Sequence, residues 1–234
     1  MHRAKTSLAD GPYGADYFTR GSTYQKFRGP ADAGTRLSRW YTGALRYLRS
    51  SGIDVLTEPG PVAEVGCGYG GVLRLLRQAR TDVVGLDISD FALSQVRGVD
   101  PWQALVAGDV ARLPFASGPV GLLLAFEVLE HIASPHDAVV ELARVLRPGG
   151  LLVATTPNPA GDVLPGANSG RDPTHVSVQE PYRWGMLLNA THLEVTHLRT
   201  VWQLPWAWRF SSAFALVLPL PRIGPGCVIV GRKR

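Results

Sequence analysis

Histidines and carboxylates that could move a proton lie at two places in this chain of 234 residues. In the stretch Glu127-x-x-Glu130-His131, the three side chains can fall on one side of a helical turn and offer two carboxylates and an imidazole together. His175 follows a long segment rich in proline and glycine. Because the pKa of histidine lies near neutrality, we predict His175 as a general base and His131 as a second candidate. The alternative for His175 is that it braces the helix that follows.

A glycine-rich turn predicts where a ligand of the nucleotide type would bind. From Val62 the chain reads VAEVGCGYGG, so an apolar strand breaks into a turn in which Gly66 and Gly68 leave no side chain between the backbone and a bound molecule. A second apolar run ends at Asp87, 21 residues after Gly66, which is the spacing of a carboxylate that binds ribose hydroxyls. Asp87 could instead cap the next helix, as could Ser89.

Two further apolar runs also end in polar residues. They extend from Ala104 to Asp109 and from Gly121 to Glu127. Ligands of open α/β sheets bind outside the carboxyl ends of the strands. The four runs therefore predict a rim of functional groups along one edge of a sheet.

Five motifs in this order resemble class I S-adenosylmethionine-dependent methyltransferases. They read EVGCGYG from Glu64, GLD ending at Asp87, AGD ending at Asp109, FEVLEH from Phe126 and LRPGG ending at Gly150. The resemblance implies S-adenosylmethionine as the cofactor, with Asp87 on the ribose and Asp109 facing the adenine. The cofactor-binding residues that it implies are Glu64, Gly66, Cys67, Gly68, Asp87, Ile88, Asp109, Val110, Phe126 and Glu127.

A nicotinamide or flavin dinucleotide is the rival cofactor, because Gly66-x-Gly68-x-x-Gly71 fits that fingerprint as well. Two observations count against it. Glu64, two residues before the turn, resembles the methyltransferase signature. One sheet also uses the full length of the chain, which leaves no second domain for a hydride acceptor.

The segment that ends at His131 also resembles the metal site of small-RNA 2′-O-methyltransferases and of some ubiquinone-pathway O-methyltransferases. The resemblance implies a divalent ion on Glu127, Glu130, His131 and His175, which would lower the pKa of acceptor hydroxyls. Such ligands suit Mg²⁺, Mn²⁺ or Zn²⁺. The same pattern occurs in related methyltransferases in which the acid and the histidine are structural, so both interpretations stay open.

Strands that alternate with helices predict an α/β fold. We expect a Rossmann-like, doubly wound sheet of seven strands, mostly parallel with an antiparallel C-terminal strand. Residues 193–201 and 227–230 should form an antiparallel pair at its edge. Helical spacing over residues 37–48 predicts a helix before the first strand.

Two serines predict helix starts later in the chain. Ser134 precedes Pro135, as a capping serine often precedes proline in the first turn. Ser177, three residues before Glu180, predicts a capping box that opens a helix to about residue 189. Between these helices, proline and glycine make residues 156–172 a long irregular loop, which we expect to help form the acceptor pocket.

The first part of the chain is predicted to cover the site. We divide the chain into an N-terminal cap or lid segment with its helix, residues 1–55, and an S-adenosylmethionine-binding catalytic domain, residues 56–234. Tyr13, Tyr17, Phe18 and Tyr24 are candidate lid residues. Loosely ordered or simply packed aromatic residues are the alternative.

Charge and cysteine content narrow the possible partners. The net charge is +5 at pH 7, and residues 1–50 hold nine Lys or Arg against three Asp. These basic residues are spaced rather than clustered along the sequence, which disfavours nucleic acid as a partner. The two cysteines, Cys67 and Cys227, exclude a disulfide framework and are typical of the cytoplasm. No apolar run has the length needed to span a membrane.

Taken together, the sequence predicts a cytoplasmic S-adenosylmethionine-dependent methyltransferase of a small-molecule acceptor. O-methylation of a natural-product or sugar intermediate is the preferred reaction. Three alternatives stay open, because a fold does not fix a reaction. They are a cofactor-dependent cyclase or other non-methylating member of the fold, a metal-dependent RNA 2′-O-methyltransferase, and a non-catalytic cofactor-binding protein.

Overall fold

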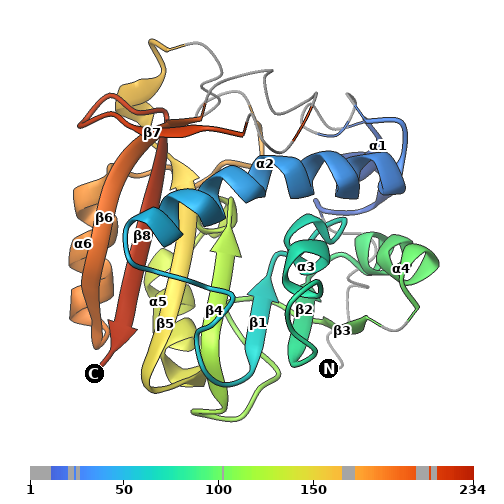
Figure 1. Ribbon diagram of the computed structural model, residues 1–234, viewed down its shortest axis with the longest axis horizontal. Coiled ribbons are helices and arrows are strands. Elements are labelled where there is room, and N and C mark those ends of the chain that lie inside the picture. Colours follow the sequence, from blue (N-terminus) through green and yellow to red (C-terminus); the bar gives the residue numbers. More distant parts are fainter. Residues whose placement is uncertain are drawn as a thin grey trace, which may run out of the picture.

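The protein, in a computed structural model, forms one eight-stranded sheet with helices packed on both faces (Figure 1). The structure describes residues 12–20, 24, 27–101, 103–164, 172–203, 211 and 215–234. Its strands are β1 (Val62–Val65), β2 (Val83–Asp87), β3 (Ala104–Ala107), β4 (Val120–Phe126), β5 (Leu146–Pro157), β6 (Leu193–Gln203), β7 (Val217–Pro219) and β8 (Gly226–Lys233).

The α-helices are α1 (Ala15–Arg20), α2 (Pro30–Ser50), α3 (Gly71–Leu76), α4 (Asp90–Val99), α5 (Pro135–Val145) and α6 (Pro181–Ala190). Two short 3₁₀ helices, η2 (Leu129–His131) and η3 (Pro159–Gly161), follow β4 and β5. In Figure 1, α2 crosses in front of the sheet near the arrowheads of β1 and β4. This places α2 beside the edge at which the sequence predicts the site.

The strand order is β3-β2-β1-β4-β5-β8-β6-β7. Neighbours from β3 to β5 pair in parallel, and β8 runs antiparallel to both β5 and β6. The predicted fold class and the antiparallel C-terminal strand are therefore confirmed. The order reverses between β1 and β4, and open α/β sheets bind ligands at such a switch point.

The predicted number of seven strands is wrong. The additional strand is β7, which pairs with β6 through Val217, Leu218 and Pro219. Three residues are too few to show a strand's alternation of apolar and polar side chains, so the sequence did not reveal it. β6 and β8 do pair antiparallel, as predicted. They are not the edge of the sheet, however, because β7 lies beyond β6.

The core has two layers, one on each face of the sheet, because side chains alternate along each strand. Ala63, Leu123 and Ala154 face α5 and α6, where Leu142 and Trp184 are fully buried. Neighbouring positions on the same strands face the other layer, which holds residues of α2, α3 and α4. These core residues include Leu48, Val62, Val72, Leu76, Leu93, Leu122 and Val153.

The predicted helix starts are partly corrected. Ser134 does precede α5, but its hydroxyl donates to Asp137 Oδ2 (2.7 Å) and caps no backbone N–H. The capping box at Ser177 is wrong, since α6 begins at Pro181 with Glu180 before it. Proline presets the backbone for the first helical turn, and here it overrides the serine signal.

Part of the predicted loop is regular structure. β5 extends to Pro157, and η3 follows directly. Residues 165–171 of that segment lie outside the described part of the chain. None of the helices in the described ranges has the length and apolar character to cross a membrane.

Candidate active site

The glycine turn after β1 has the backbone geometry that the sequence predicts. Gly66 and Gly68 have φ angles of 68° and 48°, in the left-handed region that favours glycine. A Cβ on Gly66 would lie 2.4 Å from Val128 Cγ2, and one on Gly68 would lie 3.1 Å from the Tyr24 hydroxyl. Side chains at these positions would enter space that the surrounding residues need.

Asp87, at the end of β2, braces this turn. Its Oδ2 accepts a hydrogen bond from Gly68 N (2.7 Å), and its Oδ1 accepts one from Ser89 N (2.9 Å). Burial raises the pKa of the Asp87 carboxyl, although these backbone donors lower it. The capping role falls to Ser89, whose hydroxyl accepts from Ala92 N at the start of α4. Asp87 therefore holds the turn and keeps lone pairs for a ligand.

A cavity of about 390 Å³ lies between this turn and the N-terminal aromatic residues. Its volume is in the range of small-molecule sites. Tyr13, Tyr17, Phe18 and Tyr24 line one side of it. The predicted cofactor residues that line it are Gly66, Gly68, Asp87, Ile88, Asp109, Val110 and Glu127.

A second cavity of about 290 Å³ adjoins the first. The remaining predicted cofactor residues, Glu64, Cys67 and Phe126, line this second cavity. Burial raises the pKa of both the Glu64 carboxyl and the Cys67 thiol, because it disfavours the charged form of each group. The residues shared by the two cavities are Tyr17, Tyr24, Gly66, Gly68, Glu127 and His131.

The acid and imidazole cluster forms, but its backbone differs from the prediction. Glu130 and His131 lie in η2, whereas Glu127 precedes the helical turn and has a φ of 55°. Positive φ is rare for a residue with a Cβ and often marks a functional position. Glu127 lines both cavities, and its side chain is exposed to them. Desolvation by the surrounding protein raises the pKa of its carboxyl.

Hydrogen bonds fix which nitrogen of His131 carries its proton. Nδ1 lies 3.2 Å from the carbonyl oxygen of Thr174 and 2.9 Å from the Thr174 hydroxyl, which itself donates to Asp172 Oδ1 (2.6 Å). A carbonyl oxygen can only accept, so Nδ1 must donate. Burial and the nearby His175 lower the pKa of His131 to about 4. The ring is therefore neutral at pH 7 and presents the Nε2 lone pair.

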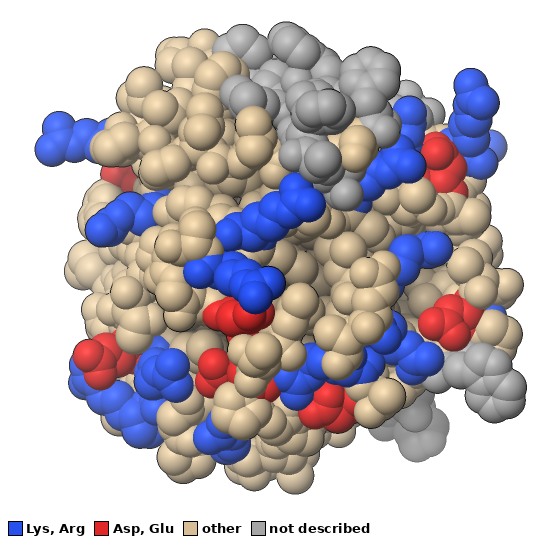
Figure 2. Space-filling view, in the orientation of Figure 1, with Lys and Arg blue, Asp and Glu red and all other residues tan. Residues whose placement is uncertain are grey.

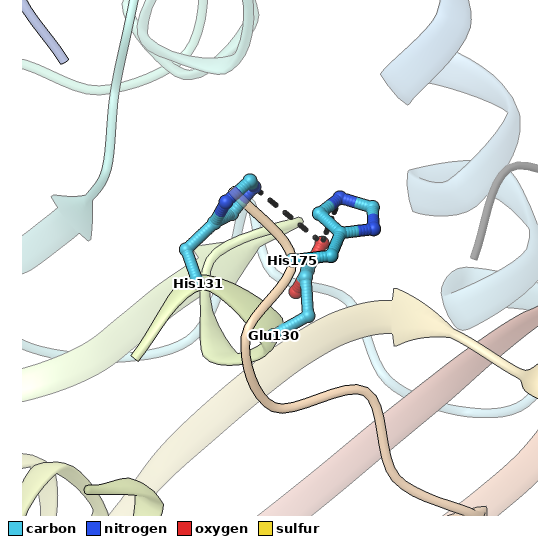
Figure 3. Close-up of side chains that lie close together, drawn as sticks. All are labelled: Glu130, His131 and His175. Carbon is cyan, nitrogen blue, oxygen red and sulfur yellow. Dashed lines mark ion pairs between the residues drawn. The ribbon is translucent and has the colours of Figure 1, made fainter. Parts of the chain in front are cut away.

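Glu130 lies between the two histidines (Figure 3). Its Oε1 is 4.0 Å from His131 Nε2 and 4.0 Å from His175 Nε2. The side chain is fully buried, and neither carboxylate oxygen has a hydrogen-bond partner in the described part of the chain. Burial and the charge of Glu127 raise the pKa of Glu130 well above its usual range.

The ligating atoms of Glu130, His131 and His175 lie within 4.8 Å of one another. Carboxylate and imidazole groups are ligands for divalent ions in proteins, so the chemistry of this donor set fits such an ion. Glu127 is outside this group of three, so the structure brings together only part of the predicted metal set.

Sequence reasoning missed several residues of the second cavity. Thr174 orients His131 but carries no motif of its own. Trp40 and Tyr41 on α2 and Trp202 on β6 line the cavity wall, and Tyr41 stacks on Phe126 with ring centroids 5.2 Å apart. The helical spacing of α2 indicated a buried face, but not that this face borders a cavity.

The Ser38 hydroxyl joins α2 to the glycine turn. It lies 2.8 Å from the carbonyl oxygen of Gly71, the first residue of α3, and 2.7 Å from that of Gly34. The helix that forms one wall of the second cavity is thus attached directly to the segment that shapes the first.

Arginines of α2 form a groove on the other flank of that helix. Arg39, Arg46 and Arg49 line it together with Arg74 of α3, and Arg49 pairs with Asp54 at 3.3 Å. Figure 2 shows basic side chains along this face. Although the arginines are spaced in the sequence, helical periodicity brings them to one side of α2.

The central part of the chain is similar to known methyltransferases. Residues 63–154 match the family described as methyltransferase domain. A protein of Mycolicibacterium smegmatis named as an S-adenosylmethionine-dependent methyltransferase is 32% identical over 147 residues, which are 63% of this chain and 54% of that protein. A malonyl-acyl-carrier-protein O-methyltransferase of Enterobacter lignolyticus is 38% identical over 104 residues, covering 44% of this chain and 41% of that protein. The chain spans about half the length of these curated relatives.

Solved structures of low identity share the fold. A methyltransferase from Archaeoglobus fulgidus has a TM-score of 0.64 at 17% identity and covers 90% of this chain and 98% of its own. The cyclase SpnF has a TM-score of 0.58 at 17% identity and covers 87% and 81%. The part of the chain from 63 to 154, which holds the glycine turn braced by Asp87, is thus similar to methyltransferase domains, and the sheet as a whole shares the fold of solved methyltransferase structures.

Proposed function

We propose that the protein transfers a methyl group from S-adenosylmethionine to a hydroxyl of a small molecule, with natural-product or sugar intermediates as the preferred acceptors. The observation that carries this proposal is the pair of adjoining cavities, which share the wall at Glu127 and His131. One cavity would hold the donor and the other the acceptor. The name of the Enterobacter relative, an O-methyltransferase, supports oxygen as the receiving atom.

The cofactor would supply an electrophilic methyl group on a sulfonium. The chain's own part is to hold the acceptor oxygen in line with that methyl group and to remove the hydroxyl proton. We assign the removal of this proton to His175, which lies at the polar end of the second cavity. His131, with its pKa of about 4, is a weaker base, so it serves better to position the acceptor through its Nε2 lone pair.

Labelled S-adenosylmethionine and a panel of hydroxylated acceptors test this function. We expect S-adenosylhomocysteine to form only when an acceptor is present. His175→Ala should lower kcat by about 100-fold or more while cofactor affinity changes less than twofold. His136→Ala, at an exposed position of α5, is the matched control and should keep full turnover.

Two results would contradict the proposal. If no acceptor yields S-adenosylhomocysteine while the cofactor still binds, the cyclase or the non-catalytic binding protein becomes the better assignment. If His175→Ala keeps full turnover, His175 is not the base, and its role is to brace the segment before α6.

A metal-assisted form of the same reaction is the second candidate. It is favoured by Glu130, whose buried carboxylate oxygens lie between two imidazoles and have no hydrogen-bond partner among the described residues. The ion would be held by Glu130, His131 and His175 and would acidify the acceptor hydroxyl. Calorimetry with Mn²⁺ and Zn²⁺ tests the site without any turnover. Binding that is lost in Glu130→Gln supports it, whereas chelator-insensitive activity and no metal binding leave these residues structural.

A further inference from the structure

The second cavity has two ends of opposite chemistry. Its polar end holds Glu127, Glu130, Asp172 and the two histidines. Its other end lies between α2 and the strands that follow β5, in the region where α2 contacts β7 (Figure 1). The residues that line this apolar end include Trp40, Tyr41, Val201, Trp202, Val217 and Val228.

Flat aromatic surfaces dominate the apolar end. Tyr41 is stacked on Phe126 with an interplanar angle of 23°, and Phe126 is the last residue of β4, directly before Glu127. Gln203 fixes α2 at this point, because its amide donates to the carbonyl oxygen of Trp40 (2.7 Å). Stacked rings next to a fixed helix favour a ligand that is itself flat and apolar.

The polar end is rich in carboxyl groups. Those of Glu127, Glu130 and Asp172 all line it. Neither lysine nor arginine lines the cavity within the described ranges of the chain. A negative charge in such a site is disfavoured, since protein surroundings screen it less than water does.

We propose that the acceptor is a compact ring compound without negative charge, which lays its ring against Tyr41 and Trp40 and presents its hydroxyl to the carboxylate and imidazole end. This inference rests on the proposed function and names the acceptor class for the same site. A cavity of about 290 Å³ has the size for a ligand of one or two fused rings. Acceptors that would bring a carboxylate, phosphate or sulfate group to the reacting end are excluded by their charge.

Two probes that differ in charge test the inference without turnover. The full chain is saturated with S-adenosylhomocysteine, and 2-naphthol and 2-naphthoate are titrated by calorimetry at pH 7.5. We expect naphthol to bind at least tenfold more tightly than naphthoate. Equal affinities, or tighter binding of naphthoate, would overturn the proposal.

Three variants separate shape from charge. Tyr41→Leu should weaken naphthol binding about three- to tenfold, whereas Tyr182→Leu, at an exposed position of α6, should leave both affinities unchanged. Asp172→Asn should reduce the ratio of the naphthol affinity to the naphthoate affinity at least threefold. An unchanged preference in Asp172→Asn would show that charge does not select the acceptor, and an unchanged affinity in Tyr41→Leu would show that the ring lies elsewhere.

Failure of this inference is distinguishable from failure of the proposed function. If naphthol binds more tightly than naphthoate but no acceptor is methylated, the proposed acceptor class is supported and the proposed methyl transfer is contradicted. If anionic acceptors are methylated efficiently, the proposed methyl transfer is supported and the proposed acceptor class is contradicted.

Discussion

At the scale of single residues, Asp87 connects the second strand to the glycine turn. Sequence spacing predicted a carboxylate at this place, and the fold adds that both of its oxygens accept backbone hydrogen bonds. The same side chain thus shapes the first cavity, in which we propose that the cofactor binds, and lines it. Its removal should affect the cavity more than the fold.

Asp87→Ala is expected to weaken S-adenosylhomocysteine binding by at least tenfold, or about 1.4 kcal/mol, because hydrogen bonds to a charged group are lost. Calorimetry on the purified variant measures this. Asp90→Ala is the control, since Asp90 is an exposed acid in the first turn of α4. Equal affinities for the two variants would remove Asp87 from the cofactor site.

Glu64 provides a test of pH dependence. It is buried, its Oε2 has no hydrogen-bond partner among the described residues, and burial raises its pKa well above the usual value. A group whose pKa is raised by folding contributes stability at low pH and loses it as the pH rises toward its folded pKa. Ionisation of the buried Glu64 carboxyl therefore lowers the stability of the protein, and this loss grows as the pH rises.

Glu64→Gln should raise the free energy of unfolding at pH 8 by about 1–3 kcal/mol and have a smaller effect at pH 5. Urea unfolding at the two pH values measures the difference. A variant that is less stable than the wild type at pH 8 would show that the carboxylate has a favourable charged role. Cofactor affinity should be measured separately, because Glu64 also lines the second cavity.

At the scale of elements, α2 depends on close backbone approach. A Cβ on Gly43 would lie 2.6 Å from the carbonyl oxygen of Ala215, and one on Gly34 would lie 2.9 Å from that of Tyr69. Glycine in the middle of a helix costs about 1 kcal/mol relative to alanine. These glycines let the helix lie close to its neighbours, which offsets that cost.

Gly43→Ala should therefore destabilise the protein by about 1–3 kcal/mol, because the clash exceeds the gain in helix propensity. Gly98→Ala in α4 is the matched control, since a Cβ there meets nothing within 4 Å. The control should gain up to about 1 kcal/mol. Thermal unfolding of both variants gives the two signs, and a stabilised Gly43→Ala would contradict the close approach of α2.

Elements that are marked by residues close together in the sequence were predicted well. β1, β2 and the glycine turn were predicted within a residue or two, because apolar runs, glycines and terminal acids lie together in the sequence. The start of α6 and the strand β7 were not, since their definition comes from pairing and packing with distant segments. The wall at Trp40 and Trp202 also required the fold, because 161 positions separate these residues in sequence.

At the scale of the whole molecule, charge is distributed unevenly between the two flanks of α2. One flank contributes to the arginine groove and the other to the second cavity, whose polar end is acidic. Nucleic acid approaching the basic face would therefore not be led by the same charges into the reacting end. This arrangement separates surface attraction from acceptor binding.

We accordingly expect weak, nonspecific affinity for RNA. A fluorescein-labelled 20-nucleotide RNA, followed by anisotropy, should bind no tighter than about 10⁻⁶ M at 150 mM salt and lose affinity as salt rises. Arg46→Glu should weaken this binding further while the affinity for S-adenosylhomocysteine stays constant. Tight, salt-resistant RNA binding would favour the RNA 2′-O-methyltransferase alternative.

The hydroxyl contact between Ser38 and Gly71 has a thermodynamic consequence. If acceptor binding restricts the motion of α2, the glycine turn would already be ordered when the cofactor binds. The two ligands would then bind cooperatively. Such coupling must be reciprocal: the factor by which S-adenosylhomocysteine tightens naphthol is the factor by which naphthol tightens S-adenosylhomocysteine. In Ser38→Ala both factors should fall together toward one, so a single missing oxygen would make two ligands independent of each other.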